Sequence, residues 1–83
     1  MNVDAIPAEL RERPQWVLWR TARRDGKLTK VPYQAHRPND KAAVDNPATW
    51  SPFMVAYDAV ADGKVDGAGI VLGDALVGVD LDH

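Results

Sequence analysis

Residues 15–33 read QWVLWRTARRDGKLTKVPY, and this stretch decides the fold because it predicts a β-hairpin. The run Gln15–Arg20 is rich in Trp and Val, which favours a strand. The Asp-Gly pair at 25–26 is typical of a tight hairpin turn, since a type I′ turn needs positive φ at both central positions. The second arm is expected at Leu28–Tyr33. Because Pro32 has no N–H to donate, this arm lies at a sheet edge or ends there.

A helix is expected after a polar loop at Gln34–Pro47. Its apolar residues recur at i, i+3, i+4 and i+7 and form one stripe: Phe53, Ala56, Tyr57 and Val60. Ser51 is expected to cap the first turn, with Pro52 at the first helical position. Gly63 is expected to end the helix in the left-handed conformation. A shorter helical turn is predicted upstream, over Ile6–Arg13.

Two further β-rich runs, Ala68–Leu72 and Leu76–Asp82, predict a second hairpin. The first run is apolar throughout, which is typical of a central strand buried on both faces. In the second run, alternation directs one set of side chains toward a core: Val77, Val79 and Leu81. The other face then carries Leu76, Gly78, Asp80 and Asp82. The sequence therefore predicts an α+β fold, in which two β-hairpins form a small antiparallel or mixed sheet with one main helix packed on a face.

The size and composition of the chain fit one small domain spanning residues 1–83. Hydrophobic residues make up 46% of the sequence and charged residues 27%, which is ordinary for a globular protein. There are no cysteines, so disulfides and thiolate metal ligands are excluded. No run approaches the roughly 20 apolar residues of a membrane span. We therefore expect a cytoplasmic protein with no membrane partner.

The net charge of −2 conceals an uneven distribution. Residues 11–41 hold nine basic and three acidic side chains, whereas residues 42–83 hold seven aspartates and one lysine. A basic half beside an acidic half is what phosphate-handling enzymes need, because cations bind the polyanion and carboxylates bind the metal. The alternative is a solvated surface of mixed charge.

The segment LVGVDLDH at 76–83 is the candidate metal site. Asp80 and Asp82 are two residues apart in an expected strand, so both carboxylates point the same way and suit Mg²⁺ or Mn²⁺. Gly78 precedes them on that face and leaves room for a nucleotide. The alternative is a solvated strand end. His83 falls on the opposite face by alternation, and His36 is expected to be a surface residue.

The basic hairpin is the second candidate. Its cations alternate with aromatic residues, an arrangement that suits phosphate binding by Lys30, Arg20 and Arg24 and base stacking by Trp19 and Tyr33. The alternative is a solvated turn with tryptophan in the core. Because residues 16 and 19 point to opposite faces, at least one tryptophan is expected to be core.

These segments, in this order, resemble the amino-terminal part of the bifunctional primase-polymerases of phages, plasmids and prophages, in the archaeo-eukaryotic primase superfamily. The resemblance covers nearly the whole chain and rests on IPAELRERPQWVLWR, RRDGKLTKVPY, NPATWSPF, GAGIVLGD and LVGVDLDH. It implies the amino-terminal half of a primase-polymerase fold. It also implies that Asp80 and Asp82 bind the divalent metal that activates a nucleoside triphosphate, and that Lys30 matches a recurrent family position.

The sequence departs from this family in one respect. The family's later histidine motif and third acidic residue lie beyond the first motif, and this sequence stops at His83. We therefore expect a fragment truncated after the first catalytic motif, with DNA and nucleoside triphosphates as partners of the intact enzyme and little activity alone. The alternative is a stand-alone, non-catalytic phage- or prophage-derived protein that binds nucleic acid or a protein partner, for example as an inhibitor or decoy. In that case a homodimer through an exposed sheet edge is also expected.

Overall fold

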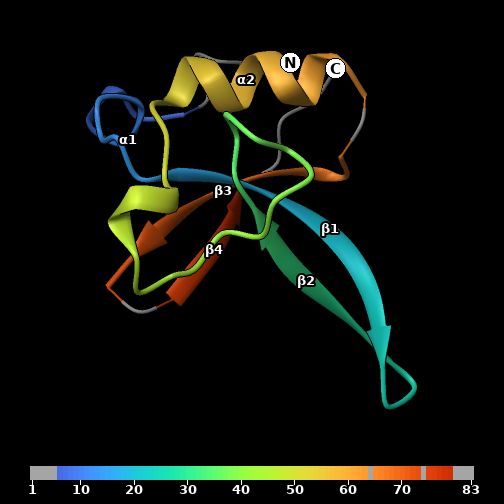
Figure 1. Cartoon of the computed structure of the whole chain (residues 1–83). Helices are drawn as coiled ribbons and strands as arrows, with labels where there is room; N and C mark the ends of the chain where they lie inside the picture. Colours follow the sequence, from blue (N-terminus) through green and yellow to red (C-terminus); the bar gives the residue numbers. More distant parts are fainter. Residues whose placement is uncertain (1–5, 64, 74, 80–83) are drawn as a thin grey trace.

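The computed structural model describes residues 6–63, 65–73 and 75–79 and contains one sheet and one main helix (Figure 1). The elements follow in the order α1 (Ala8–Arg11), β1 (Trp16–Arg24), β2 (Lys27–Tyr33), the 3₁₀ turn η2 (Pro47–Thr49), α2 (Phe53–Ala61), β3 (Gly67–Leu72) and β4 (Ala75–Val79).

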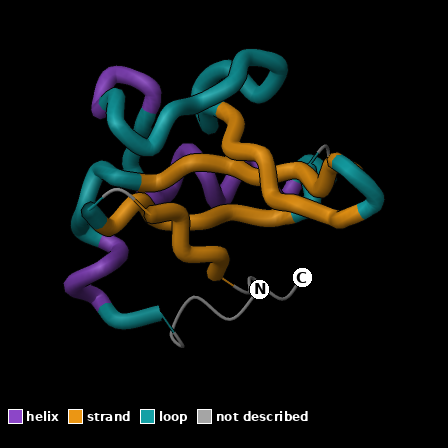
Figure 2. Tube along the Cα trace, turned by 90° about the horizontal axis from the view of Figure 1, so that it is seen from below, coloured by secondary structure: helices purple, strands orange, loops and turns teal. Residues whose placement is uncertain are grey.

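The four strands form an antiparallel sheet in the order β2-β1-β3-β4. Helix α2 covers one face of this sheet, and in the view from below the strands lie in front of it (Figure 2). The expected α+β arrangement of two hairpins and one helix is therefore confirmed, and the sheet is antiparallel throughout.

The first hairpin closes at the two residues that the sequence predicted. Asp25 has φ 51° and Gly26 has φ 78°, as a type I′ turn requires. Its arms are longer than expected, because the ladder runs without a break from Leu18↔Tyr33 to the Arg24↔Lys27 pair beside the turn. Beyond residue 19, β1 has no partner in β3, so the distal part of the hairpin is a two-stranded ribbon that extends away from α2 (Figure 1).

The hydrophobic core lies between α2 and the two central strands. Its buried members are Ile6, Trp16, Leu18, Ala35, Phe53, Ala56, Val60, Ala68 and Ile70. The rings of Trp16 and Phe53 meet edge to face, with centroids 4.8 Å apart. As expected, one tryptophan is core, and residues 67–71 of β3 are buried on both faces.

The ends of α2 differ in how well the sequence predicted them. Gly63 has φ 76° and its N–H donates to the Val60 carbonyl, which confirms the left-handed cap. The expected Ser51 cap is wrong, because Pro52 occupies the N-cap position and no side chain caps the helix. Ser51 instead pairs with Trp16 across an isolated bridge, and its buried hydroxyl shares a 2.8 Å hydrogen bond with Nδ1 of His36.

The expected core position of Val77 is also wrong. Val77 pairs with Ile70 and so lies on the α2 side of the sheet, yet its side chain is 43% exposed. The reason is that α2 packs over β1 and β3, and β4 is the outer strand beyond them. Leu81, which was expected to face the core as well, lies outside the described residues.

Candidate functional site

The face of the sheet opposite α2 carries three of the predicted site residues: Trp19, Lys30 and Gly78. Trp19 pairs with Gly67, and the strand alternation puts Lys30 and Gly78 on the same side. Gly69, opposite Gly78 in the ladder, belongs to this side too. We call these five residues the glycine face, because three of them have no side chain to fill it.

Trp19 is fixed on the glycine face by two contacts. Its indole Nε1–H donates to the Ala68 carbonyl over 3.0 Å. The ring lies directly against Gly67, where an added Cβ would come within 2.7 Å of three ring atoms. Any larger residue at position 67 would therefore displace the ring. The indole is held as part of the sheet surface and forms a platform for the next residue.

Lys30 of β2 lies over the Trp19 ring, and its ammonium reaches β4, the strand at the other edge of the sheet. Its ammonium is 4.7 Å from the centroid of the Trp19 ring, a cation–π arrangement. The same nitrogen is 2.5 Å from where a Cβ on Gly78 would stand. In a flat sheet β2 and β4 would be about 14 Å apart, three strand spacings. The contact therefore requires a strongly curled sheet, and it places a cation from β2 against β4.

Lys30 has no acidic partner among the described residues. Lys30 is an exposed residue, and Trp19 beneath it is half-buried. The only salt bridge among the described residues joins Arg13 to Glu9, so no described carboxylate neutralises Lys30. No enclosed cavity lies within the part of the chain that the structure describes. The glycine face is thus partly covered, since Gly67 and Gly69 are buried, and it carries a cation that no described carboxylate pairs with.

The predicted metal ligands Asp80 and Asp82, together with His83, lie outside the described residues, which end at Val79 of β4. Within residues 6–63, 65–73 and 75–79, no three His, Cys, Asp or Glu side chains gather as a metal site. The metal therefore remains a prediction from sequence.

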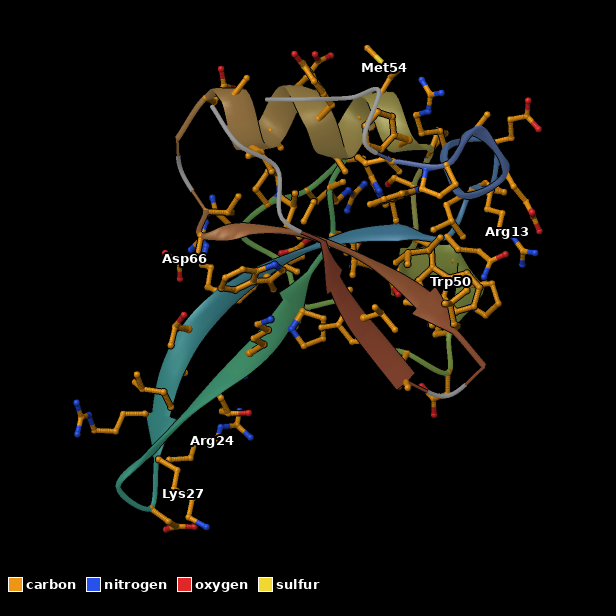
Figure 3. All side chains as sticks on the ribbon, turned by 180° about the vertical axis from the view of Figure 1, so that it is seen from behind. Arg13, Arg24, Lys27, Trp50, Met54 and Asp66 are labelled. Atoms are coloured by element: carbon orange, nitrogen blue, oxygen red, sulfur yellow. The ribbon has the colours of Figure 1, made fainter. Side chains whose placement is uncertain are left out.

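The remaining predicted site residues are not on the glycine face. The Arg20 guanidinium stacks over the ring of Tyr33, 4.8 Å from its centroid, and both belong to the α2 side of the sheet by the strand alternation. Arg24 lies at the tip of the hairpin, far from α2 (Figure 3). The structure thus brings Lys30, Trp19 and Gly78 together, and places Arg20 with Tyr33 and Arg24 elsewhere.

Two residues that shape this region were not singled out from sequence. Gly67 supports the Trp19 ring, and Asp66 anchors the base of the hairpin by accepting a 2.6 Å hydrogen bond from the Thr21 N–H. That N–H lies beyond the last β1–β3 pair, so it has no strand carbonyl to donate to. Neither contact could be predicted from the sequence, because both depend on which residues of β1 lie beside the start of β3.

No protein-family model matches the sequence, and no curated protein matches it significantly. None of the helices in the described part of the chain is long and apolar enough to cross a membrane.

Proposed function

We propose that this chain is the amino-terminal part of a nucleotidyltransferase of the primase-polymerase type, and that its glycine face binds the triphosphate of a nucleotide. The resemblance to primase-polymerases supplies the reaction class. The position of Lys30 supplies the physical support, because a cation projects over the strand that runs into the Asp80-x-Asp82 motif.

The contact between Lys30 and Gly78 is the observation that carries the proposal. Gly78 stands two residues before Asp80 in sequence, so the ammonium is held close to the start of the expected metal motif. A triphosphate needs both kinds of group, since a lysine neutralises phosphate oxygens directly and a carboxylate-bound cation bridges others. Of the three glycines only Gly78 is exposed, because the Trp19 ring covers Gly67 and Leu76 covers Gly69, so the room for this ligand lies beside Gly78.

The donor set fits a divalent metal. Asp80 and Asp82 offer carboxylate oxygens, which Mg²⁺ and Mn²⁺ prefer, and Mg²⁺ is commonly held by one or two carboxylates plus substrate phosphates. When bound, the metal would neutralise charge on the triphosphate. Lys30, which lies over the Trp19 ring, would contact oxygens of the same triphosphate.

The test is calorimetric binding of dATP in the presence of Mn²⁺. We expect Lys30→Met to weaken binding by at least tenfold, because a hydrogen bond to a charged group is worth about 1.5–3 kcal/mol. Lys30→Arg should retain part of the affinity, and Lys27→Met, which removes the same charge at the hairpin tip, should have little effect. Equal losses for Lys30→Met and Lys27→Met would contradict a specific site.

The metal is tested separately, without nucleotide. Mn²⁺ binding followed by electron paramagnetic resonance should be lost in Asp80→Asn and in Asp82→Asn, and retained in Asp62→Asn on the exposed end of α2. Retention of the Mn²⁺ signal in the Asp80 and Asp82 variants would refute the metal assignment and leave the Lys30 site to be judged by the dATP experiment.

A second candidate function is non-catalytic binding to nucleic acid or to a protein, including a second copy of the chain. The observation that favours it is the exposed ribbon of the first hairpin, which carries positive charge away from the glycine face (Figure 3). Binding of nucleic acid by a chain that binds neither dATP nor Mn²⁺ would favour this candidate.

A further inference from the structure

The distal part of the first hairpin forms a basic arm, which we define as residues 21–29. It contains Arg23, Arg24 and Lys27 against the single acid Asp25, a net charge of +2. The whole chain carries −2, so the remaining residues together carry −4. The arm is thus a local positive feature on an acidic protein.

The shape of the arm separates its charges from the body. β1 pairs with β3 only over Trp16–Trp19, so beyond this point the hairpin has no third strand. Almost every residue of the arm is exposed, and Arg24 and Lys27 lie at the end of the molecule farthest from Met54 of α2 (Figure 3). These cations are therefore free to meet a large partner without obstruction from the body.

The charges of the arm are not neutralised within the described chain. Arg24 and Lys27 face each other directly across the ladder, and like charges in such a pair destabilise a sheet. The one described salt bridge, between Arg13 and Glu9, lies elsewhere. Arg24 and Lys27 thus repel each other, and no described carboxylate relieves this repulsion. A bound polyanion would relieve it.

The arm presents cations on both of its faces. The register pairs Arg24 with Lys27 on one face and Arg23 with Leu28 on the other. A two-stranded β-ribbon fits the major groove of duplex DNA, which is about 12 Å wide and has phosphates along both walls. Cations on the two faces of a ribbon would meet these two walls.

We infer that the basic arm binds duplex DNA by inserting into the major groove and contacting phosphates on both sides. This surface is distinct from the glycine face, so the inference does not depend on nucleotide binding at Lys30. Phosphate contacts of this kind position a protein on DNA without reading its sequence.

The experiment measures binding of a fluorescent 20-base-pair duplex to the chain by anisotropy at several KCl concentrations. The arm variant replaces Arg23, Arg24 and Lys27 by Gln. The matched control replaces three basic residues of the body by Gln: Arg13, Arg37 and Lys41. The substituted arm side chains are exposed, and thermal unfolding of both variants verifies that they fold.

We expect the arm variant to bind the duplex at least tenfold more weakly. The magnitude of the slope of log K against log salt should also fall by about 2 to 3, since each lost phosphate contact reduces it by about 0.9. The body control should keep most of the affinity and slope. Equal effects of the two variants, or no binding by the unmodified chain at 50 mM KCl, would overturn the inference. Tighter binding to single-stranded DNA than to the duplex, or equal competition by polyglutamate, would overturn it as well.

Discussion

The ammonium of Lys30 lies 4.7 Å from the centroid of the Trp19 ring, and the ring in turn lies against Gly67. These three residues come from strands β2, β1 and β3. The Lys30 ammonium also lies against Gly78 of β4, so the contacts involve all four strands. A lysine side chain is flexible and loses entropy when it is held. The aromatic platform offsets part of this loss, because the cation–π attraction contributes about 0.5–1 kcal/mol at an exposed site.

Gly78→Val should displace the Lys30 ammonium without unfolding the protein. The added Cβ would meet only the end of a flexible side chain, so the free energy of unfolding should change by less than about 1 kcal/mol. The Cε protons of Lys30 should lose the upfield ring-current shift caused by Trp19, as seen by NMR. Trp19→Leu is the positive control for that loss. An unchanged Lys30 spectrum in Gly78→Val would show that the ammonium does not rest there.

Gly67→Ala should destabilise the protein by about 1–3 kcal/mol, because the new methyl group would overlap the Trp19 ring. Urea unfolding measures this cost. The control is the same substitution in a Trp19→Leu background, where the overlap is relieved and the cost should shrink. If Gly67→Ala lowered the free energy of unfolding equally in both backgrounds, overlap with the Trp19 ring would not be the cause.

Leu18 and Leu28 form a matched pair of one residue type in different surroundings. Leu18 is fully buried in the core, whereas Leu28 on the basic arm is 68% exposed. Leu18→Ala should therefore cost about 2–5 kcal/mol, enough to unfold much of so small a domain, and Leu28→Ala should stay within about 0.5 kcal/mol. Chemical denaturation compares the two. Similar costs for both would mean that the arm packs against the body in solution.

Asp66→Ala should loosen the base of the arm, because Thr21 N–H loses its carboxylate acceptor. We expect a loss of about 0.5–1.5 kcal/mol, because the bond is exposed and water can replace the lost acceptor, together with faster amide hydrogen exchange at Thr21. Asp66→Asn keeps an oxygen that accepts the bond, so its exchange should be closer to that of the unmodified chain. Exchange at the turn residue Gly26 serves as an internal reference that neither variant should alter.

The hairpin turn, the main helix and the central strand were all predictable from the amino-acid sequence. Each of these depends on local chemistry: the Asp-Gly pair accepts positive φ, the apolar stripe of 53–60 repeats with the helical period, and the run 68–72 is apolar throughout. The alternation of residues 16–19 put the two tryptophans on opposite faces, and the structure shows that Trp16 is the one in the core.

Only the tertiary structure decided which of the predicted site residues meet. Lys30 and Gly78 lie on the two outer strands and touch because the sheet curls, and curl is a property of all four strands together. The errors have the same cause. Ser51 was expected to cap a helix but pairs with β1, and Val77 was expected in the core but lies beyond the reach of α2. A sequence pattern fixes the direction of a side chain along its own strand, whereas the neighbour that the side chain meets depends on the packing of distant segments.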